Sequence, residues 1–340
     1  MKSGSSCISK QSRKIISQIV VFFKDEFRSI VSRTQCDSSC NPRKSNSAFG
    51  LDKRYHQRYH VHTNQQLHKT IPYTKMERTD MATSAAITCQ NCSVEISEKT
   101  FVDAHKVCPA CGYHYPMTAY ERLELLVDSD SFDEHDAGLY STNPLDFPDY
   151  EEQLTRDYAK TGLKSEILTG EAKIGGQPVA ITISDFGVRG GTMGAVVGEK
   201  VTRNIEYATQ NRLPLIIVSR SGGMRMQEGT LSLMQMAKTS AVCVKHAAAG
   251  LPYISVMADP TFGGSTASCA SLAHIILAEP GARIGFAGPL ATASIKQQLP
   301  KNFQKAEFLL EHGMIDRIVQ RSEMRSLLIN LLDFCADLPR

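Results

Sequence analysis

The C-terminal half of the chain repeats a pattern of short apolar run, glycine-containing turn and amphipathic stretch. Residues 168–174 and 179–184 are rich in β-branched side chains and flank a Gly-Gly-Gln-Pro turn at 175–178, which predicts a β-hairpin. A glycine-dense loop follows at 187–194. Further predicted strands are continuous apolar runs at residues 213–219, 251–258, 274–278 and 282–286. Continuous apolar runs are typical of strands buried on both faces of a sheet.

Amphipathic stretches between these runs predict helices that connect parallel strands. The predicted helices are residues 195–209, 224–246 and 265–272, with two earlier ones at 119–128 and from about 150 to 160. Strands that alternate with helices indicate an α/β fold. We therefore predict a parallel sheet covered by crossover helices.

The first 80 residues differ from the rest in charge and pattern. They hold 15 of the 38 Lys and Arg residues but 6 of the 35 Asp and Glu residues, and they lack a sustained hydrophobic period. Such composition predicts a basic, largely disordered arm. It is an organellar transit peptide, or a leader without function, or the result of a start codon set too far upstream, with Met76 or Met81 as the true start. Cys36 and Cys40 show no pattern that would turn them toward each other, so no metal site is predicted there.

Length and hydropathy narrow the class of protein. A chain of 340 residues with 42% hydrophobic content can form one large domain and a small additional module. No apolar run approaches the roughly 20 residues that a membrane-spanning helix needs. The stretch 15–23 contains Ser17 and Gln18 and lacks a cleavage site, unlike a secretory signal. We expect a soluble cytoplasmic protein, with a plastid location as the alternative.

Four cysteines have the spacing of a zinc ribbon. Cys89 and Cys92 form one Cys-x-x-Cys turn, and Cys108 and Cys111 form a second after fifteen intervening residues. Each turn can direct two sulfurs to one point, so we predict a closed, structural Zn²⁺ site. A redox pair or a run of buried thiols is the alternative.

The charge of the ribbon and the positions of the later cysteines argue against further functions for both. The ribbon carries slightly more acidic than basic residues, which argues against a phosphate-binding surface. Nucleic acid is therefore an unlikely partner. Three remaining cysteines lie in apolar helical surroundings and are predicted to be buried core thiols: Cys243, Cys269 and Cys335.

Three pairs of adjacent glycines follow strands or precede helices. They are Gly190-Gly191, Gly222-Gly223 and Gly263-Gly264. Two interpretations are open: fixed amide donors for a negative oxygen at a helix N-terminus, or ordinary turns that allow close packing. The chain has no phosphate loop, nucleophile elbow or dinucleotide fingerprint. A site made of backbone donors suits chemistry in which the substrate supplies the base.

Several motifs together resemble one known family. Besides the zinc knuckles, they are GTMGAVVG at 191–198, SGGMRMQE at 221–228, SLMQMAKTS at 232–240, LPYISV at 251–256, DPTFGG at 259–264 and IGFAGP at 284–289. In this order they resemble the carboxyltransferase β subunit of multi-subunit acetyl-CoA carboxylase over about residues 89–322. The resemblance implies a crotonase-like β-β-α superhelix at 117–340, after a basic extension at 1–84 and a zinc ribbon at 85–116.

The resemblance also implies an activity and partners. A β subunit of this family transfers a carboxyl group from carboxybiotin, held on a biotin carrier protein, to acetyl-CoA, giving malonyl-CoA for fatty acid synthesis. It acts with a carboxyltransferase α subunit, in an expected α2β2 assembly, and with biotin carboxylase. The amides of Gly222 and Gly223 would stabilise an enolate or ureido oxyanion. The other four glycines would form the substrate pocket: Gly190, Gly191, Gly263 and Gly264.

The chain departs from the family pattern near the expected pocket. Arg189 replaces an apolar residue, Met224 a small one, and Leu290 an arginine. We expect Arg225 and Glu228 to brace the turn rather than to react. Alternatives are a carboxyltransferase or decarboxylase for another acyl-CoA, and a nucleic-acid-binding ribbon protein with an inactive enzyme-like body.

Overall fold

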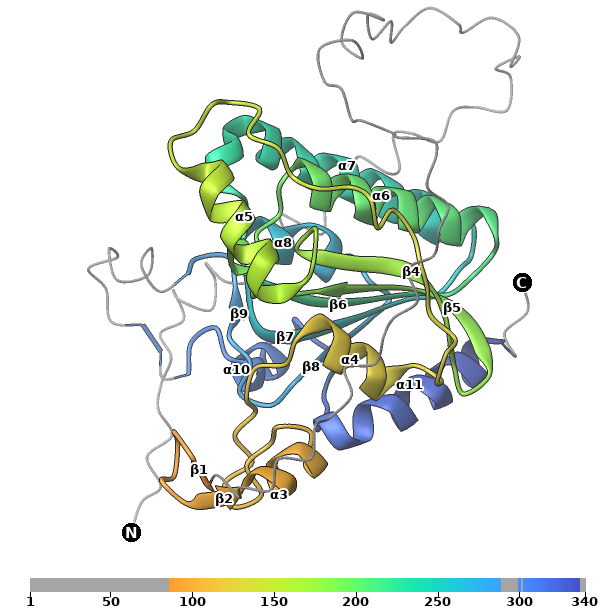
Figure 1. The fold of residues 1–340 in the computed structure, drawn as a ribbon. Coiled ribbons are helices and arrows are strands. Elements are labelled where there is room, and N and C mark those ends of the chain that lie inside the picture. The colour runs from red at the N-terminus through yellow and green to blue at the C-terminus, as the bar shows by residue number, and fades with distance from the viewer. Residues whose placement is uncertain (1–85, 289–298, 301, 337–340) are drawn as a thin grey trace, which may run out of the picture. The chain divides into compact units, whose positions relative to one another are not determined.

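The computed structural model describes residues 86–288, 299–300 and 302–336 (Figure 1). The chain divides into two units, Met1–His62 and Thr63–Arg340, and every described residue belongs to the second. The predicted arm at 1–84, Cys36, Cys40 and Leu290 lie outside the described residues. No helix in the described ranges is long and apolar enough to cross a membrane.

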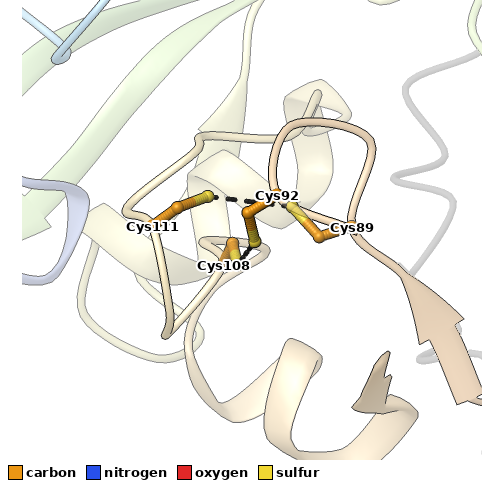
Figure 2. A group of neighbouring side chains, drawn as sticks. All are labelled: Cys89, Cys92, Cys108 and Cys111. Carbon is orange, nitrogen blue, oxygen red and sulfur yellow. Dashed lines mark hydrogen bonds between the residues drawn. The ribbon is translucent and has the colours of Figure 1, made fainter. Parts of the chain in front are cut away.

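The described chain begins with a small cysteine-bearing module (Figure 2). Strand β1 (Ala86–Thr88) pairs antiparallel with β2 (Glu95–Ser97), and helix α3 (Glu98–Asp103) follows directly. The amide of Thr100 donates to the Ser97 side chain, which caps this helix. The core of the module consists of five buried residues: Cys89, Ile96, Phe101, Cys108 and Tyr115. So small a core cannot offset the entropy of folding without a further cross-link.

A mixed sheet forms the body of the protein. Its strand order is β10-β8-β7-β6-β5-β4-β3, and β9 pairs with the far end of β7. The strands are β3 (Asp133–Glu134), β4 (Ile167–Ile174), β5 (Gln177–Ser184), β6 (Leu215–Ser221), β7 (Tyr253–Phe262), β8 (Ile275–Ala278), β9 (Ile284–Gly285) and β10 (Arg317–Ile318). The pairs from β3 to β5 are antiparallel, and those from β5 through β8 to β10 are parallel. The predicted parallel sheet is confirmed, with an antiparallel edge.

The predicted hairpin is confirmed with a shorter turn. Ile174 pairs with Gln177, so the loop consists of Gly175 and Gly176 alone instead of four residues. Both glycines have positive φ, as a two-residue hairpin loop that matches the strand twist requires. Pro178 is therefore part of β5.

Helices cover both faces of the sheet (Figure 1). Helices α4 (Ala119–Leu126) and α11 (Arg321–Ala336) pack on one face, and α6 (Ala195–Gln210) packs on the other with α7 (Gly229–Ala248) against it. The remaining helical elements of the body are α5 (Tyr150–Thr161), α8 (Gly263–Ala267), α10 (Ala306–Glu311), and 3-10 turns at Arg189–Gly191, Met226–Glu228 and Cys269–Ser271.

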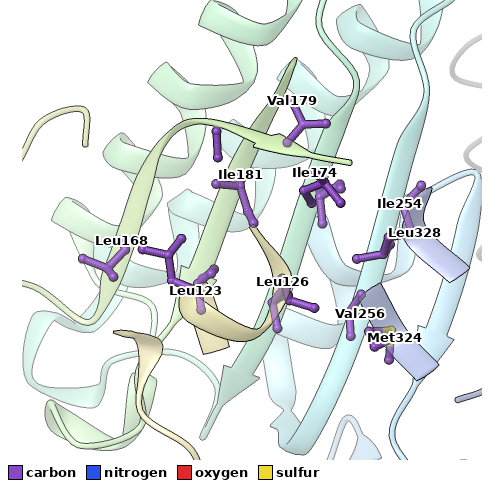
Figure 3. Close-up of a cluster of buried hydrophobic side chains, with 14 of the residues drawn as sticks. Leu123, Leu126, Leu168, Ile174, Val179, Ile181, Ile254, Val256, Met324 and Leu328 are labelled. Carbon is purple, nitrogen blue, oxygen red and sulfur yellow. The ribbon is translucent and has the colours of Figure 1, made fainter. Parts of the chain in front are cut away.

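The central strands are buried on both sides, as their apolar runs predict. Ile216 and Val218 of β6 belong to the cluster under α4 and α11, while Leu215 and Ile217 belong to the cluster under α6. Figure 3 shows side chains of the two helices pointing toward the strands: Leu123 and Leu126 of α4, and Met324 and Leu328 of α11. This packing fixes the positions of the loops that follow the strands.

Two predicted helices have different bounds in the structure. The helix expected from residue 224 begins at Gly229, because Met224 pairs with Met193 in an isolated bridge and the Arg225 amide donates to the Met193 carbonyl over 2.9 Å. The helix expected at 265–272 divides into α8 and a 3-10 turn, and β7 continues to Phe262. Tertiary contacts therefore override local helix propensity next to two of the diglycine turns.

Candidate active site and metal centre

The four cysteines of the ribbon converge on one point (Figure 2). Sγ of Cys89 lies 3.8 Å from Sγ of Cys111, Sγ of Cys92 lies 3.7 Å from Sγ of Cys108, and all four sulfurs are within 4.8 Å of one another. A tetrahedron of sulfurs at about 2.3 Å from a central ion has edges of about 3.8 Å. These separations exceed the about 2.05 Å of a disulfide. The donor set fits a closed four-coordinate metal site.

Nearby donors favour the thiolate form of Cys89 and Cys111, whereas desolvation and the neighbouring sulfurs raise the pKa of Cys92. The Asn91 amide donates to Cys89 Sγ, and the Asn91 side chain donates to Cys111 Sγ, each over 3.4 Å. Desolvation raises the pKa of Cys89, but hydrogen bonds from the Tyr115 hydroxyl and backbone amides outweigh it and lower this pKa to about 6. A thiolate is the form that binds a metal.

A buried charge cluster joins the ribbon to the sheet. Both carboxylate oxygens of Glu279, at the end of β8, accept from Arg122 of α4 and from Arg321 of α11, over 2.7 to 3.2 Å. Nη1 of Arg321 also donates to the carbonyls of His105 and Tyr115, over 2.8 and 3.0 Å. All three charged side chains are at most 4% exposed. Arg321 therefore forms the seat of the ribbon on the body, and Lys106 of the ribbon adds an ion pair with Glu121 of α4 over 2.6 Å.

The three diglycine turns meet at the carboxyl ends of the parallel strands. The amide of Gly222, after β6, donates to the carbonyl of Gly190 over 2.8 Å. A Cβ on Gly263, after β7, would lie 3.1 Å from Cα of Gly223, and one on Gly191 would lie 2.3 Å from the carbonyl oxygen of Arg220. Gly191 and Gly263 also have φ of about 60°. Only glycine allows these backbones to approach so closely.

The amides of the second turn already have protein acceptors. The Gly222 amide is bound to Gly190 as above, and the Gly223 amide donates to Oγ of Ser221 over 3.1 Å. Ser221 Oγ in turn lies 2.8 Å from Oγ of Ser265 in α8. An oxyanion at this turn would compete with a carbonyl and a hydroxyl for these donors. The turn also lies six residues before α7 and is not a helix N-terminus.

A buried polar cluster holds two of the turns together. Arg225 donates from Nε to Thr192 Oγ1 over 2.6 Å, from Nη2 to the Thr192 carbonyl over 2.7 Å, and from Nη1 to the Tyr150 hydroxyl over 2.5 Å. Its Nη2 lies 2.7 Å from a carboxylate oxygen of Glu166. The Tyr150 hydroxyl donates to Glu228 over 2.8 Å, and burial raises the pKa of Tyr150, so it remains a donor. Arg225 thus ties the loop of Gly190-Gly191 to that of Gly222-Gly223.

Glu228 occupies the start of α6. Its Oε2 accepts from the amide of Ala195 over 2.5 Å, and a Cβ on Gly194 would lie 2.4 Å from its Oε1. A carboxylate at a helix N-terminus is favoured by the helix dipole. This helix N-terminus is therefore filled by the protein itself rather than open to a substrate anion.

Two of the residues that depart from the family pattern, Met224 and Arg189, have structural partners. A Cβ on Gly264 would lie 2.4 Å from the sulfur of Met224. Met224 therefore fills the space beside the third diglycine turn. The amide of Arg189 donates to Asp157 of α5 over 2.8 Å, and Nη1 of Arg189 lies 3.5 Å from the same carboxylate.

Some of these residues were missed by sequence reasoning. The bracing role expected for Arg225 and Glu228 agrees with their contacts, but Tyr150, Glu166 and the Arg122–Glu279–Arg321 cluster were not predicted. Their signal in the sequence is weak because their partners lie far apart along the chain, 157 residues for Arg122 and Glu279. A charged residue within an apolar run was the only available indication.

The cysteines that the structure describes outside the ribbon have no part in this site. Cys243 and Cys269 are buried core thiols, as predicted, and burial raises the pKa of Cys269 to about 11. Cys335 on α11 is only partly buried, so the prediction of a core thiol is wrong there. Leu332, nearly one turn earlier, is the last buried residue of α11, so the core ends before Cys335.

Comparisons with known proteins point to one family. A family model for the carboxyl transferase domain matches residues 116–305. The acetyl-coenzyme A carboxylase carboxyl transferase subunit beta of Desulforamulus reducens is 48% identical over 257 residues, covering 75% of this chain and 89% of the relative. The protein of the same name from Citrifermentans bemidjiense is 51% identical over 248 residues, covering 72% and 88%.

Solved structures share the fold. A transcarboxylase 12S crystal structure with methylmalonyl-coenzyme A bound has a TM-score of 0.56 at 28% identity over 66% of this chain, which spans only 42% of that chain. A Pseudomonas malonate decarboxylase hetero-tetramer in complex with malonate has a TM-score of 0.53 at 26% identity, covering 66% of this chain and 83% of that one. The predicted α/β, crotonase-like carboxyltransferase fold is confirmed. With relatives about half identical over most of both chains, the protein belongs to the family of acetyl-coenzyme A carboxylase carboxyl transferase β subunits.

Proposed function

We propose that this β subunit binds acetyl-CoA at the meeting point of the three diglycine turns, where it accepts a carboxyl group from carboxybiotin. The observation that supports the proposal is the contact among Gly190, Gly222 and Gly263 loops at the carboxyl ends of parallel strands. Ligands of open α/β sheets bind at this end of the strands. Backbones without side chains leave room there for a thioester arm.

The chemistry asks the protein for positioning and charge stabilisation. Carboxybiotin supplies CO2, its ureido nitrogen takes a proton from the acetyl methyl group, and the resulting enolate carbon forms the new bond to CO2. The Gly223 amide can support the enolate or ureido oxygen by exchanging its bond to Ser221 for one to the substrate. Arg225 would hold the two loops in register during that exchange. Preorganised donors of this kind stabilise developing negative charge.

We assign zinc to the four cysteines as a structural ion. Four thiolates leave no open coordination position, so the ion would stabilise the ribbon and not activate water. The tetrahedral separations of the sulfurs support this assignment. Cys89, Cys92, Cys108 and Cys111 would be the ligands.

The partners are inferred from the family. A carboxyltransferase α subunit would complete the active site, in an α2β2 assembly, and a biotin carboxyl carrier protein charged by biotin carboxylase would deliver the carboxyl group. We further infer a division into an extension at 1–84, a ribbon at 85–116 and a catalytic domain at 117–340.

Reconstitution tests the proposal directly. The β chain should be inactive alone, and with an α subunit it should carry out malonyl-CoA-dependent carboxylation of a biotin derivative, the reverse reaction. Zinc content of the complex is measured in parallel. A zinc-loaded, assembled complex with no activity would contradict the proposal. The same assay on a chain that begins at Met81 shows whether the first 80 residues contribute.

The acyl group is the second point to test. The solved transcarboxylase carries methylmalonyl-coenzyme A, and the solved decarboxylase carries malonate. Comparing malonyl-CoA with methylmalonyl-CoA in the reverse assay separates an acetyl-CoA enzyme from one for a longer acyl group. We expect kcat/KM to favour malonyl-CoA.

A further inference from the structure

Arg220 carries a positive charge at the end of β6, two residues before Gly222. Its Nε donates to the carbonyl of Asp259 over 2.6 Å, and its Cζ lies 4.6 Å from the centroid of the Phe186 ring. These contacts hold the plane of the guanidinium from one edge and one face. The terminal nitrogens Nη1 and Nη2 have no partner among the described residues.

The acids nearest to Arg220 are engaged elsewhere. Asp259 binds Arg283 through both carboxylate oxygens, and Asp185 accepts from the amides of Ala119 and Gly187. Glu279 is shared by the two arginines of the ribbon seat. Burial lowers the pKa of Arg220, although an arginine stays protonated in proteins. Arg220 is thus a partly buried cation without an ion-pair partner in the described parts of the chain.

The free end of this cation is accessible, and the Phe186 ring beneath the guanidinium borders the first diglycine turn. Its terminal nitrogens are not among the buried side-chain atoms that lack a partner, so they reach solvent. A Cβ on Gly190 would lie 3.7 Å from Cζ of Phe186, whose ring stacks on the guanidinium. The backbone carbonyl of Arg220 leaves no room for a Cβ on Gly191. Arg220, Phe186 and the turn therefore form one contiguous surface.

We propose that Arg220 is a substrate-binding residue that holds the free carboxylate of a malonyl thioester through its two terminal nitrogens. A guanidinium with both terminal nitrogens free binds a carboxylate through two parallel hydrogen bonds. A partner that arrives with the substrate explains why the protein supplies none. The inference rests on the proposed function, because the malonyl group is the product of that carboxyl transfer.

The test compares two ligands that differ by this carboxylate. Dissociation constants for malonyl-CoA and acetyl-CoA are measured on the assembled complex with the α subunit, for the wild type and for Arg220→Gln. Arg220→Gln should weaken malonyl-CoA about 10- to 100-fold and leave acetyl-CoA within about twofold, the range for one charge-assisted pair. Arg220→Lys keeps the charge but cannot form two parallel hydrogen bonds. Its dissociation constant for malonyl-CoA should lie between those of the wild type and Arg220→Gln.

Each other outcome counts against the inference in its own way. Equal weakening of both ligands would mean that Arg220 binds a phosphate of coenzyme A. No change in either would mean that it binds no ligand, and loss of assembly only in Arg220→Gln would make it a subunit contact. Arg212→Gln, an exposed arginine at the opposite end of β6, is the matched control. If the wild-type complex binds neither ligand, the proposed function itself fails.

Discussion

The amide of Gly222 donates its hydrogen to the carbonyl of Gly190, so two loops that follow different strands share one bond. The same amide was predicted to face the substrate. The structure uses it to join the loops, which leaves the Gly223 amide, held by a serine hydroxyl, as the donor that can change partners at lower cost. One amide of this turn therefore holds two loops together, and the other is the donor available to a substrate oxygen.

Gly191→Ala tests whether that contact matters. Alanine at φ of about 60° costs roughly 1–2 kcal/mol anywhere, and here its Cβ would also meet the Arg220 carbonyl at 2.3 Å. The turn must shift, and we expect kcat of the reconstituted enzyme to fall about 100-fold. Gly250→Ala is the control, because φ is 70° there and nothing lies within 4 Å. Equal activity in both variants would contradict the role of the contact.

Tyr150→Phe tests the cluster around Arg225. Removing the hydroxyl leaves Nη1 of Arg225 without its acceptor and Oε1 of Glu228 without its donor, which should lower the free energy of unfolding by about 1–3 kcal/mol. If the cluster positions the turns, kcat should fall while KM changes little. Steady-state kinetics and urea denaturation measure the two effects. Tyr140→Phe, at a half-exposed tyrosine, should change neither.

Cys111→Ser tests the metal centre. Loss of one thiolate should abolish stoichiometric zinc and lower the unfolding temperature of the protein, because the ribbon has too small a core to fold alone. Elemental analysis and thermal unfolding give both values. Cys335→Ser, at a partly buried cysteine outside the cluster, should retain one zinc per chain. Full zinc content in Cys111→Ser would exclude the four-cysteine site.

Glu279→Gln tests the seat of the ribbon. It leaves two buried arginines without their carboxylate, which should cost about 3–5 kcal/mol in the free energy of unfolding. Glu199→Gln removes a carboxylate that pairs with Arg203 and Lys238 near the surface and should cost less than about 1 kcal/mol. Urea denaturation at pH 7 compares them. Similar costs would show that the buried cluster is not needed.

The same variant predicts a pH dependence. Burial raises the pKa of Glu279, but Arg122 and Arg321 outweigh it and hold the pKa well below its ordinary value. A depressed carboxyl pKa stabilises the fold fully above the unfolded value of about 4.3, and this contribution is lost as pH falls below it. The gap in stability between wild type and Glu279→Gln should therefore be widest at neutral pH and narrow below about pH 4. A constant gap would contradict this linkage.

Local patterns in the sequence predicted most elements but not their contacts. The apolar runs of β5, β6 and β7 and the paired glycines are visible within a few residues of chain. The meeting of Gly190, Gly222 and Gly263 depends on the register of the parallel strands, which no local pattern specifies. The start of α7 was wrong for the same reason, since Arg225 extends toward Thr192 and Tyr150 instead of continuing a helix. The functional prediction came mainly from the resemblance of the motifs to a known family, because the residue patterns alone specify no substrate.

The seat of the ribbon has a consequence for biosynthesis. The carbonyls of His105 and Tyr115 are made early, but the arginine that binds them is Arg321, at the start of the last helix. The chain must therefore be synthesised beyond Arg321 before this contact can form, however early the cysteines of the ribbon are available. A chain that ended before Arg321 would therefore lack the arginine that binds the ribbon carbonyls.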